Sequence, residues 1–411
     1  MNRTALILLL FFFTTIEIFA QSATDSIKDK KIFEGRRIDM EVFGEMTFNM
    51  YDWETYTDKN NDIDLNRIVF EPEFHFSDKV KIEMEIEIEH GGTGSTMEFD
   101  KFEEFGEFEQ EVEKGGEVLL EELELEWNAK KWLALKAGKI RVPVGLVTDT
   151  YEPLQYFTTT FNNVEQTLIP TAWYSTGIGA DLEFNKWNCK IVIVNALDNS
   201  QFSSANWIKR GALERFETVG ADAFAAALRI DYATNKNSKI GISGYIGNST
   251  PNRPKEDITD DAYVMIADLH AHQKIGALKI NALLLIGNLQ NADIISDANR
   301  NLSNNLNVKR TPVASGAIGY LIELAYDIFS LMHIQNNTLD VFAGYYYYDS
   351  MYNTTGDVFN NPRWERNEIR TGISYVWNKH IAIKSDVTFR TIGIPDMNKE
   401  TTYTTALAFQ F

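Results

Sequence analysis

The most regular feature of this chain is an alternation of hydrophobic and polar residues with a period of two, which is typical of β-strands rather than helices. The clearest example runs from Val80 to Glu89, where Val, Ile and Met alternate with Lys and Glu. One face of this segment is wholly apolar and the other wholly charged, because successive side chains of a strand point to opposite faces. The pattern therefore predicts strands that separate an apolar environment from a polar one.

Sixteen segments repeat this pattern along the chain. They are residues 38–52, 65–76, 80–90, 117–127, 132–146, 176–184, 189–197, 220–232, 239–247, 261–272, 276–287, 314–327, 338–349, 365–376, 381–390 and 401–411. Each is long enough to supply the roughly 9–11 residues that a tilted membrane-spanning strand needs. Short and long connections alternate strictly between them, and this alternation is the signature of a transmembrane barrel. We therefore predict an all-β protein, a transmembrane antiparallel β-barrel of sixteen strands.

The N-terminal residues predict export from the cytoplasm. A short positive start precedes an apolar run at residues 5–13, and Ala20 provides the small residue of a cleavage site. We interpret residues 1–20 as a signal peptide, 21–37 as a short periplasmic extension and 38–411 as the barrel. No later run approaches the roughly 18 apolar residues of a spanning helix, and only helices and closed barrels satisfy every backbone group in lipid. The expected location is the outer membrane.

The last strand ends in an apolar alternation, Tyr403, Thr405, Leu407, Phe409 and Phe411. A terminal aromatic residue on such a strand resembles the assembly signal of outer-membrane proteins. Aromatic residues also border the short turns, as expected for a girdle at the lipid–water interface. The expected partners are outer-membrane lipid and the barrel-assembly machinery, and nucleic acid is not among them.

The net charge of −20 is concentrated in one hairpin, because residues 83–126 alone carry a net charge of −15. The glutamates predicted to line the lumen are Glu83, Glu85, Glu87 and Glu89 on one strand and Glu122, Glu124 and Glu126 on its neighbour. Like charges opposite one another destabilise a sheet, so these residues need basic partners, bound cations or water. A solvated acidic wall and a divalent-cation site with oxygen ligands are both open, although no calcium-loop motif is present and the metal is unknown.

The third long connection, residues 147–175, is the candidate constriction. It carries the acidic residues Asp149, Glu152 and Glu165, and the strand before it carries Lys139 and Arg141. Both cations are expected to point inward, although a bulge near Gly138 could shift the phase of that strand. Opposite charges facing one another across the bore would set ion selectivity. The alternative is that they only tie the loop to the wall.

The sequence around this loop resembles a known family. The segments KAGKIRVPVGL, YEPLQYF and NNVEQTLIPTAWYSTGIGADLEF resemble the porins of the phosphate-selective O and P type, taken in the broad sense. The resemblance implies a sixteen-stranded barrel, a homotrimer, a third outer loop that constricts the pore, and passage of small ions or solutes. Characterised members draw anions along an inward ladder of Arg and Lys. Lys139 and Arg141 match that pattern, and Arg229, Arg370 and Arg390 are further inward-facing candidates, whereas the acidic hairpin departs from it.

Other function classes have weaker support. No G-x-S-x-G motif occurs, so an enzyme and a cofactor are not expected. His270 and His272 share a strand face, but two histidines without further ligands are usually ordinary lumen residues. A non-channel barrel, either an adhesin or a structural protein, is the second class, and a barrel enzyme is the third, because one fold hosts many functions.

Overall fold

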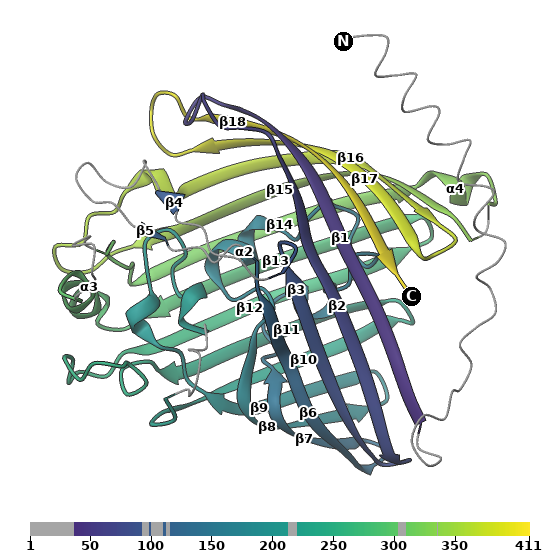
Figure 1. The fold of residues 1–411 in the computed structure, drawn as a ribbon, viewed down its shortest axis with the longest axis horizontal. Coiled ribbons are helices and arrows are strands. Elements are labelled where there is room, and N and C mark those ends of the chain that lie inside the picture. Colours follow the sequence, from purple (N-terminus) through teal and green to yellow (C-terminus); the bar gives the residue numbers. More distant parts are fainter. Residues whose placement is uncertain are drawn as a thin grey trace.

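The computed structural model describes residues 37–92, 98–99, 110–111, 116–212, 220–302, 310–334 and 336–411. Sixteen antiparallel strands close into one barrel, seen from the side in Figure 1. They are β1 (Arg37–Trp53), β2 (Asp62–Ser77), β3 (Val80–Glu89), β6 (Val118–Lys130), β7 (Leu133–Arg141), β8 (Tyr174–Phe184), β9 (Trp187–Asn195), β10 (Phe224–Asn235), β11 (Ser238–Asn248), β12 (Tyr263–Ile275), β13 (Leu278–Leu289), β14 (Gly316–Asp327), β15 (Thr338–Asn353), β16 (Glu365–Trp377), β17 (Ile381–Ile392) and β18 (Lys399–Gln410). The predicted sixteen-stranded barrel is confirmed.

The remaining elements lie in the connections. A two-stranded sheet of β4 (Glu98–Phe99) and β5 (Gln110–Glu111) belongs to the connection between β3 and β6. The predicted signal peptide and all of the predicted extension except Arg37 lie outside the described residues. Within the described residues, no helix is long and apolar enough to cross a membrane.

The barrel closes because its first and last strands pair. Met46 lies opposite Leu407 in the β1–β18 ladder, and the backbone N–H of Phe411 donates to the carbonyl oxygen of Val42 at 2.9 Å. Every other barrel strand pairs with its neighbours in chain order. Closure removes the two edges that an open sheet would leave unpaired.

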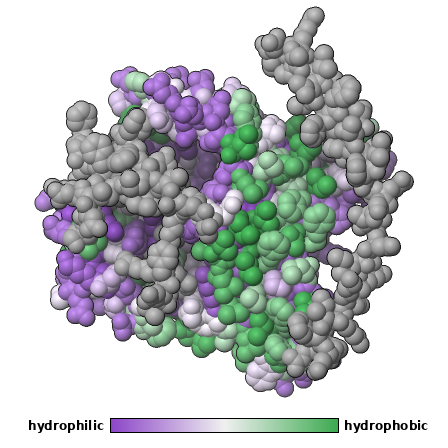
Figure 2. All heavy atoms as spheres, in the orientation of Figure 1, coloured by the Kyte–Doolittle hydropathy of each residue, from purple (hydrophilic) through white to green (hydrophobic). Residues whose placement is uncertain are grey.

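The two faces of the wall differ as the alternation predicts. Ile178, Ile193 and Ile242 are each at least half exposed on the outer face, whereas the inward-facing Val192 and Arg229 are buried. Figure 2 shows hydrophobic side chains gathered in a band across the wall, with hydrophilic side chains beside it. An apolar belt of this kind is the surface that a barrel presents to lipid.

The connections distinguish two ends of the barrel. At the short-turn end they are residues 78–79, 131–132, 185–186, 236–237, 276–277, 328–337 and 378–380, and the opposite end is the long-loop end. The expected strict alternation of length is wrong, because residues 328–337 form a longer connection than 54–61 or 393–398 at the long-loop end. The extra residues form helix α4 (Ile328–Leu331), which the side chain of Asp327 caps by accepting from the N–H of Phe329.

Strand β7 ends at Arg141, five residues before its expected end at residue 146. Pro143 lacks the N–H that a ladder requires, and Gly145 has φ of +86°, a left-handed conformation that glycine adopts easily. These two residues turn the chain out of the wall and into the barrel.

Gly138 is essential for the packing of β7 against β6. Its φ is +136°, and a Cβ there would lie 2.0 Å from the carbonyl oxygen of Leu123. We expect Gly138→Ala to lower the free energy of unfolding by about 2 kcal/mol or more, since it combines an unfavourable backbone conformation with a clash. Urea unfolding in lipid vesicles measures the change. Gly244→Ala is the matched control, because the nearest atom to a Cβ there is 3.2 Å away and the backbone is ordinary. Equal losses in the two variants would contradict the prediction.

Candidate functional site

The third long connection, residues 142–173, which we call L3, lies inside the barrel. It contains the short helices η2 (Val147–Asp149) and α2 (Asn163–Leu168), and α2 is visible between the strands in Figure 1. The Asn162 side chain caps α2 by accepting from the N–H of Glu165 at 2.9 Å. Val164 of α2 packs against Gly319 of β14 so closely that a Cβ there would lie 2.5 Å from it. A loop therefore occupies the bore, held by packing on the far wall.

Glu165 joins the two halves of L3. Its carboxylate accepts from the backbone N–H of Leu146 at 2.7 Å and of Val147 at 3.1 Å, and from the Asn162 side chain at 2.6 Å. Burial raises the pKa of Glu165 to about 7, against the opposing effect of these hydrogen bonds. Glu165 is 1% exposed, so the expectation that it faces an open bore is wrong. Its side chain points into the body of L3, where it accepts hydrogen bonds from the backbone N–H groups of Leu146 and Val147.

Asp149 fastens the start of L3 to β10 and β11. The fully buried Arg229 donates to Asp149 and, at 2.6 Å, to the carbonyl oxygen of Gly145. Lys239 reaches Asp149 at 2.5 Å. Arg229 also donates to Asp231 at 2.8 Å. Both charges of the Arg229–Asp149 pair are therefore compensated under the loop.

His270 extends this cluster to β12. Its ring nitrogens lie 2.7 Å from Asp231 and 2.6 Å from Asp268. Asp268 in turn accepts from the N–H of Gly145 at 3.0 Å. His272 contacts Asn281 instead, so the two histidines do not converge on one site.

The acidic wall is covered by aromatic residues and arginines. The Tyr151 hydroxyl donates to Glu85 at 2.6 Å and lies 3.0 Å from Glu87, and both glutamates are buried. Arg141 lies 3.3 Å from Glu85, and the guanidinium groups of Arg67 and Arg141 lie 4.4 and 4.6 Å from the centre of the Tyr151 ring. Glu85 and Glu87 are therefore part of the seal between L3 and the wall.

The remaining predicted glutamates have fewer partners. Lys136 lies 2.8 Å from Glu124 and 3.7 Å from Glu126. Lys81 contacts Glu83 and lies 3.8 Å from Glu126. Glu89 is half-buried near the long-loop end of β3. Basic partners thus compensate much of the repulsion expected within this hairpin.

Carboxylate oxygens of Glu83, Glu122 and Glu124 lie within 4.8 Å of one another. In the β3–β6 ladder, Glu83 is directly opposite Glu124, and Glu85 is opposite Glu122. Glu122 has neither a hydrogen bond nor an ion pair to another described residue. The three oxygens could ligate a cation, but the lysines already beside Glu83 and Glu124 would compete with it.

Lys139 is not where the sequence suggested. Its pairing with β6 and β8 continues through Gly138 without a register shift, so Lys139 lies opposite the outward-facing Leu123. Its ammonium group donates to the carbonyl oxygen of Leu120 at 2.9 Å and lies 3.7 Å from Glu121. The expectation that Lys139 points inward towards the loop acids is therefore wrong, because the neighbouring Ile140, which is buried in the apolar core of the lumen, takes the inward-facing position of β7.

Two other predicted site residues lie near the barrel seam. Glu152 accepts from the side chain of Gln410, which also donates to Glu41 at 2.6 Å. Arg390 donates to Glu400 at 2.6 Å and reaches the Tyr348 hydroxyl at 3.5 Å. Neither contacts Arg141 among the described residues, so the predicted charges are spread over the wall. Asp149 and Arg141 instead fit the alternative interpretation, in which the charges only attach the loop to the wall: Asp149 pairs with Arg229 and Arg141 lies beside Glu85.

Strands β16 and β17 hold the tip of L3. The buried Lys384 donates to the carbonyl oxygens of Pro153, Tyr156 and Thr158 at 2.6, 2.7 and 3.0 Å. An ammonium group with three carbonyl acceptors satisfies all of its donors. The alternation of Lys384 with the apolar Ile381 and Ile383 is consistent with an inward-facing side chain, but no local signal in the sequence indicates that it meets a loop more than two hundred residues away.

Arg370 and Asp386 complete this attachment. Arg370 donates to the Thr159 hydroxyl at 2.6 Å and to Asp386 at 2.8 Å, and Asp386 accepts from the N–H of Thr159 at 2.9 Å. Arg370 therefore points into the lumen, but L3 covers it.

The fourth long connection also enters the barrel. Phe202, Trp207 and Ile208 are buried against inward-facing residues of β12 and β13. The Trp207 indole donates to the carbonyl oxygen of Ala314 at 3.1 Å, and its ring lies 2.0 Å from where a Cβ on Gly287 would be. This side of the lumen is consequently filled by an apolar core.

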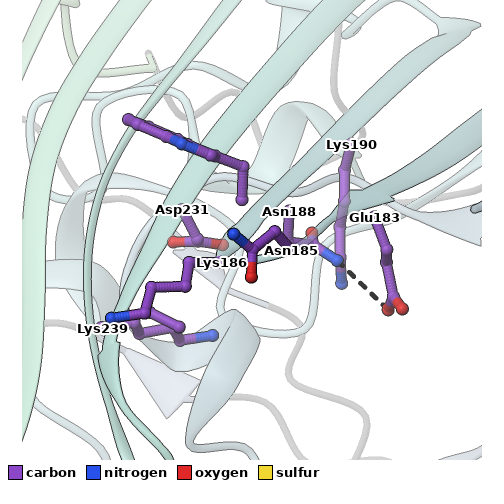
Figure 3. A pocket seen from close by; sticks show the side chains of 9 residues that line it. Glu183, Asn185, Lys186, Asn188, Lys190, Asp231 and Lys239 are labelled. Atoms are coloured by element: carbon purple, nitrogen blue, oxygen red, sulfur yellow. Dashed lines mark hydrogen bonds between the residues drawn. The ribbon is translucent and has the colours of Figure 1, made fainter.

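A cavity of about 350 Å³ opens on the β8–β11 side of the wall. Its charged lining residues are Glu183, Lys186, Lys190, Asp231 and Lys239. Figure 3 shows Lys190 and Glu183 on one side of it and Lys239 and Asp231 on the other. Open space in the bore is thus lined by charges of both signs.

The attachment of L3 can be tested at Lys384. Lys384→Met keeps the length of the side chain but leaves three loop carbonyls without their donor, which costs about 1–3 kcal/mol per buried unsatisfied group. We expect amide hydrogen exchange at residues 154–160 to accelerate by about tenfold or more. Lys279→Met is the control, because Lys279 pairs with Asp340 on the wall. Unchanged exchange in Lys384→Met would show that packing alone holds the loop.

The chain was compared with protein families, with other sequences and with solved structures. No family model matches the chain. An uncharacterized protein of Aquifex aeolicus is 25% identical over 338 residues, which make up 80% of this chain and 71% of that protein.

Several solved structures are similar to this chain in fold, although their sequence identity to it is low. OmpF of Salmonella typhi in complex with daunomycin has a TM-score of 0.56 at 12% identity, covering 92% of this chain and 98% of that one. The trimer form of OmpT of Vibrio cholerae has a TM-score of 0.51 at 10% identity, covering 92% and 99%. The anion-selective porin of Comamonas acidovorans has a TM-score of 0.52 at 9% identity, covering 92% and 100%. This chain therefore has the fold of the outer-membrane porins.

Proposed function

We propose that this protein is an outer-membrane channel through which small ions or solutes diffuse passively. The observation that carries the proposal is a closed barrel with an apolar outer belt and a charged lumen face extending over β1–β3, β6–β12 and β15–β17. A polar lumen face of this kind is suited to water and ions. The shared porin fold supports the same conclusion.

L3 is the proposed constriction. Its side chains or backbone bond to residues of β2, β3, β10, β11, β12, β16, β17 and β18. The apolar core of the fourth connection fills the side near β12 and β13. We therefore propose that the path passes L3 near the acidic strands, where Glu71 and Glu122 are half-buried and have neither hydrogen bonds nor ion pairs to other described residues.

We propose a preference for cations. Charge acts most strongly where the bore is narrow and water is scarce, and at physiological salt it is screened beyond about 8 Å. Glu85 and Glu87 are buried under Tyr151, so the carboxylates proposed to act on ions are Glu71 and Glu122. The arginines that are further inward-facing candidates for an anion ladder have carboxylate partners: Arg229 with Asp149, Arg370 with Asp386, and Arg390 with Glu400.

Catalysis is not part of the proposal. Both ring nitrogens of His270 lie within hydrogen-bond distance of carboxylates, so this histidine belongs to the charge cluster under L3 and not to a nucleophile–base pair. A barrel enzyme would need a different set of catalytic residues. An assay for hydrolysis of lipid or peptide substrates tests this alternative.

Single-channel recording in planar bilayers tests the channel and its selectivity together. In a potassium chloride gradient, the protein is expected to conduct and to give a cation-preferring reversal potential. The double variant Glu71→Gln, Glu122→Gln should shift that potential towards anions, because it removes two lumen carboxyl groups that have neither hydrogen bonds nor ion pairs to other described residues. The control Asp78→Asn, Asp396→Asn makes the same change of net charge on exposed turns.

The outcomes separate the alternatives. Absence of conductance in a correctly folded barrel would refute the channel and favour an adhesin or structural role. A clear anion preference in the unmodified protein would refute the role of the acidic wall and restore the anion ladder. Equal shifts in both double variants would mean that net charge, and not the position of the carboxylates, controls the potential.

Assembly is proposed to follow the porin pattern, as a homotrimer inserted by the barrel-assembly machinery. Phe411 is 70% exposed beside His380, with ring centres 6.2 Å apart, so it is accessible at the seam. Deleting Phe411 should lower outer-membrane abundance several-fold, measured by immunoblotting of membrane fractions. Deleting instead an exposed residue of a long loop, Asn360, is the control. Unchanged abundance after loss of Phe411 would make the terminal residue incidental.

A further inference from the structure

The short-turn end carries a ring of lysines that takes no part in the proposed constriction at L3. Exposed lysines stand in or beside six of its seven connections; they are Lys79, Lys130, Lys131, Lys186, Lys236, Lys274 and Lys379. Asp78 and Glu183 are the exposed acidic residues next to them. A chain with a net charge of −20 therefore has a strongly basic rim at one end.

The rim lies at the level of the lipid–water boundary. Lys131 is followed by Trp132 and Lys186 by Trp187, and these two indoles are about half exposed on the outer wall. Trp and Tyr rings on a barrel surface mark the headgroup level of the bilayer. The lysines beside them are consequently positioned to meet lipid headgroups.

The connection with α4 departs from the other turns at this end. Leu331 and Met332 are 62% and 64% exposed, and Ile334 is also exposed. The other short-turn connections consist mostly of polar or small residues. Apolar side chains exposed together in this way mark an interaction surface and not a solvated turn.

The α4 segment is continuous with the lipid-facing wall. Phe329 packs edge-on against Tyr375 with ring centres 6.0 Å apart, and Tyr326, immediately before the turn, is exposed on the outer face. In Figure 1, α4 projects beyond the strand ends at this end of the barrel. Its apolar residues therefore extend the outer belt and are separate from the lumen.

We propose that the short-turn rim is a two-part surface for a leaflet that contains anionic phospholipid, in which residues 328–334 insert as an apolar wedge and the lysine ring binds the headgroups. Apolar insertion and basic residues are individually weak signals that together hold a peripheral segment to a membrane. Lysines near an anionic surface each add to this attraction. The surface requires no conductance, so its tests stand independently of the proposed channel.

Insertion of the wedge is tested with a nitroxide attached to Met332→Cys in a Cys189→Ser background. The protein is reconstituted in phosphatidylcholine vesicles with about a quarter phosphatidylglycerol. We expect the label to collide with oxygen in preference to a water-soluble nickel chelate. A label at Asn237→Cys, on the exposed tip of a polar turn, is the control and should show the opposite preference.

Two results would overturn the insertion. A label at Met332→Cys as accessible to the nickel chelate as the control would place the segment in water. A label shielded from both reagents would instead place it against protein, in a contact with a second copy of this chain.

Headgroup binding is tested by native mass spectrometry of detergent-solubilised protein with equal amounts of phosphatidylglycerol and phosphatidylcholine. The triple variant Lys79→Gln, Lys236→Gln, Lys379→Gln should retain at least about threefold less phosphatidylglycerol relative to phosphatidylcholine. The control Lys59→Gln, Lys255→Gln, Lys399→Gln changes the same charge at the long-loop end and should retain it unchanged. No loss in the rim variant, or an equal loss in both, would overturn the proposal.

Discussion

The rest of this structure depends on one constraint: a hydrocarbon environment offers no hydrogen-bond partner to the backbone. Sixteen strands can meet that constraint only as a closed ring, and the ring is closed by β1 and β18. The outer face is then free to be wholly apolar, and the alternation along each strand sends every second side chain into the lumen. The chemistry of the interior follows from this division.

L3 meets the same constraint inside the barrel. A loop that crosses a bore removes its own peptide groups from bulk water, so each buried polar group needs a partner. Lys384 supplies three donors to loop carbonyls, and Glu165 accepts from two loop amides. Charged side chains thus supply the hydrogen-bond partners that the irregular backbone of L3 lacks. This accounts for the large number of charged residues that are inward-facing yet covered.

The strands were predictable from the sequence because the period of two recurs in all sixteen segments, although the strict alternation of connection length fails at residues 328–337. Lys139 shows the limit of that reasoning: alternation separates two faces but does not say which one is the lumen, and the apolar Ile140 beside Lys139 faces the inner core and not lipid. Glu165 shows another limit. Its role depends on the amides of Leu146 and Val147, which approach it only when the loop has folded back.

The contact between Lys384 and Pro153 joins residues 231 positions apart in the chain. Strand β17 is the last but one barrel strand along the chain, so the tip of L3 gains its Lys384 contacts only when a strand from the far end of the chain has joined the wall. Contacts of such sequence separation form late, because the entropy of closing the intervening chain must be overcome first. We therefore expect the width of the bore to be settled late in folding, when the wall has nearly closed.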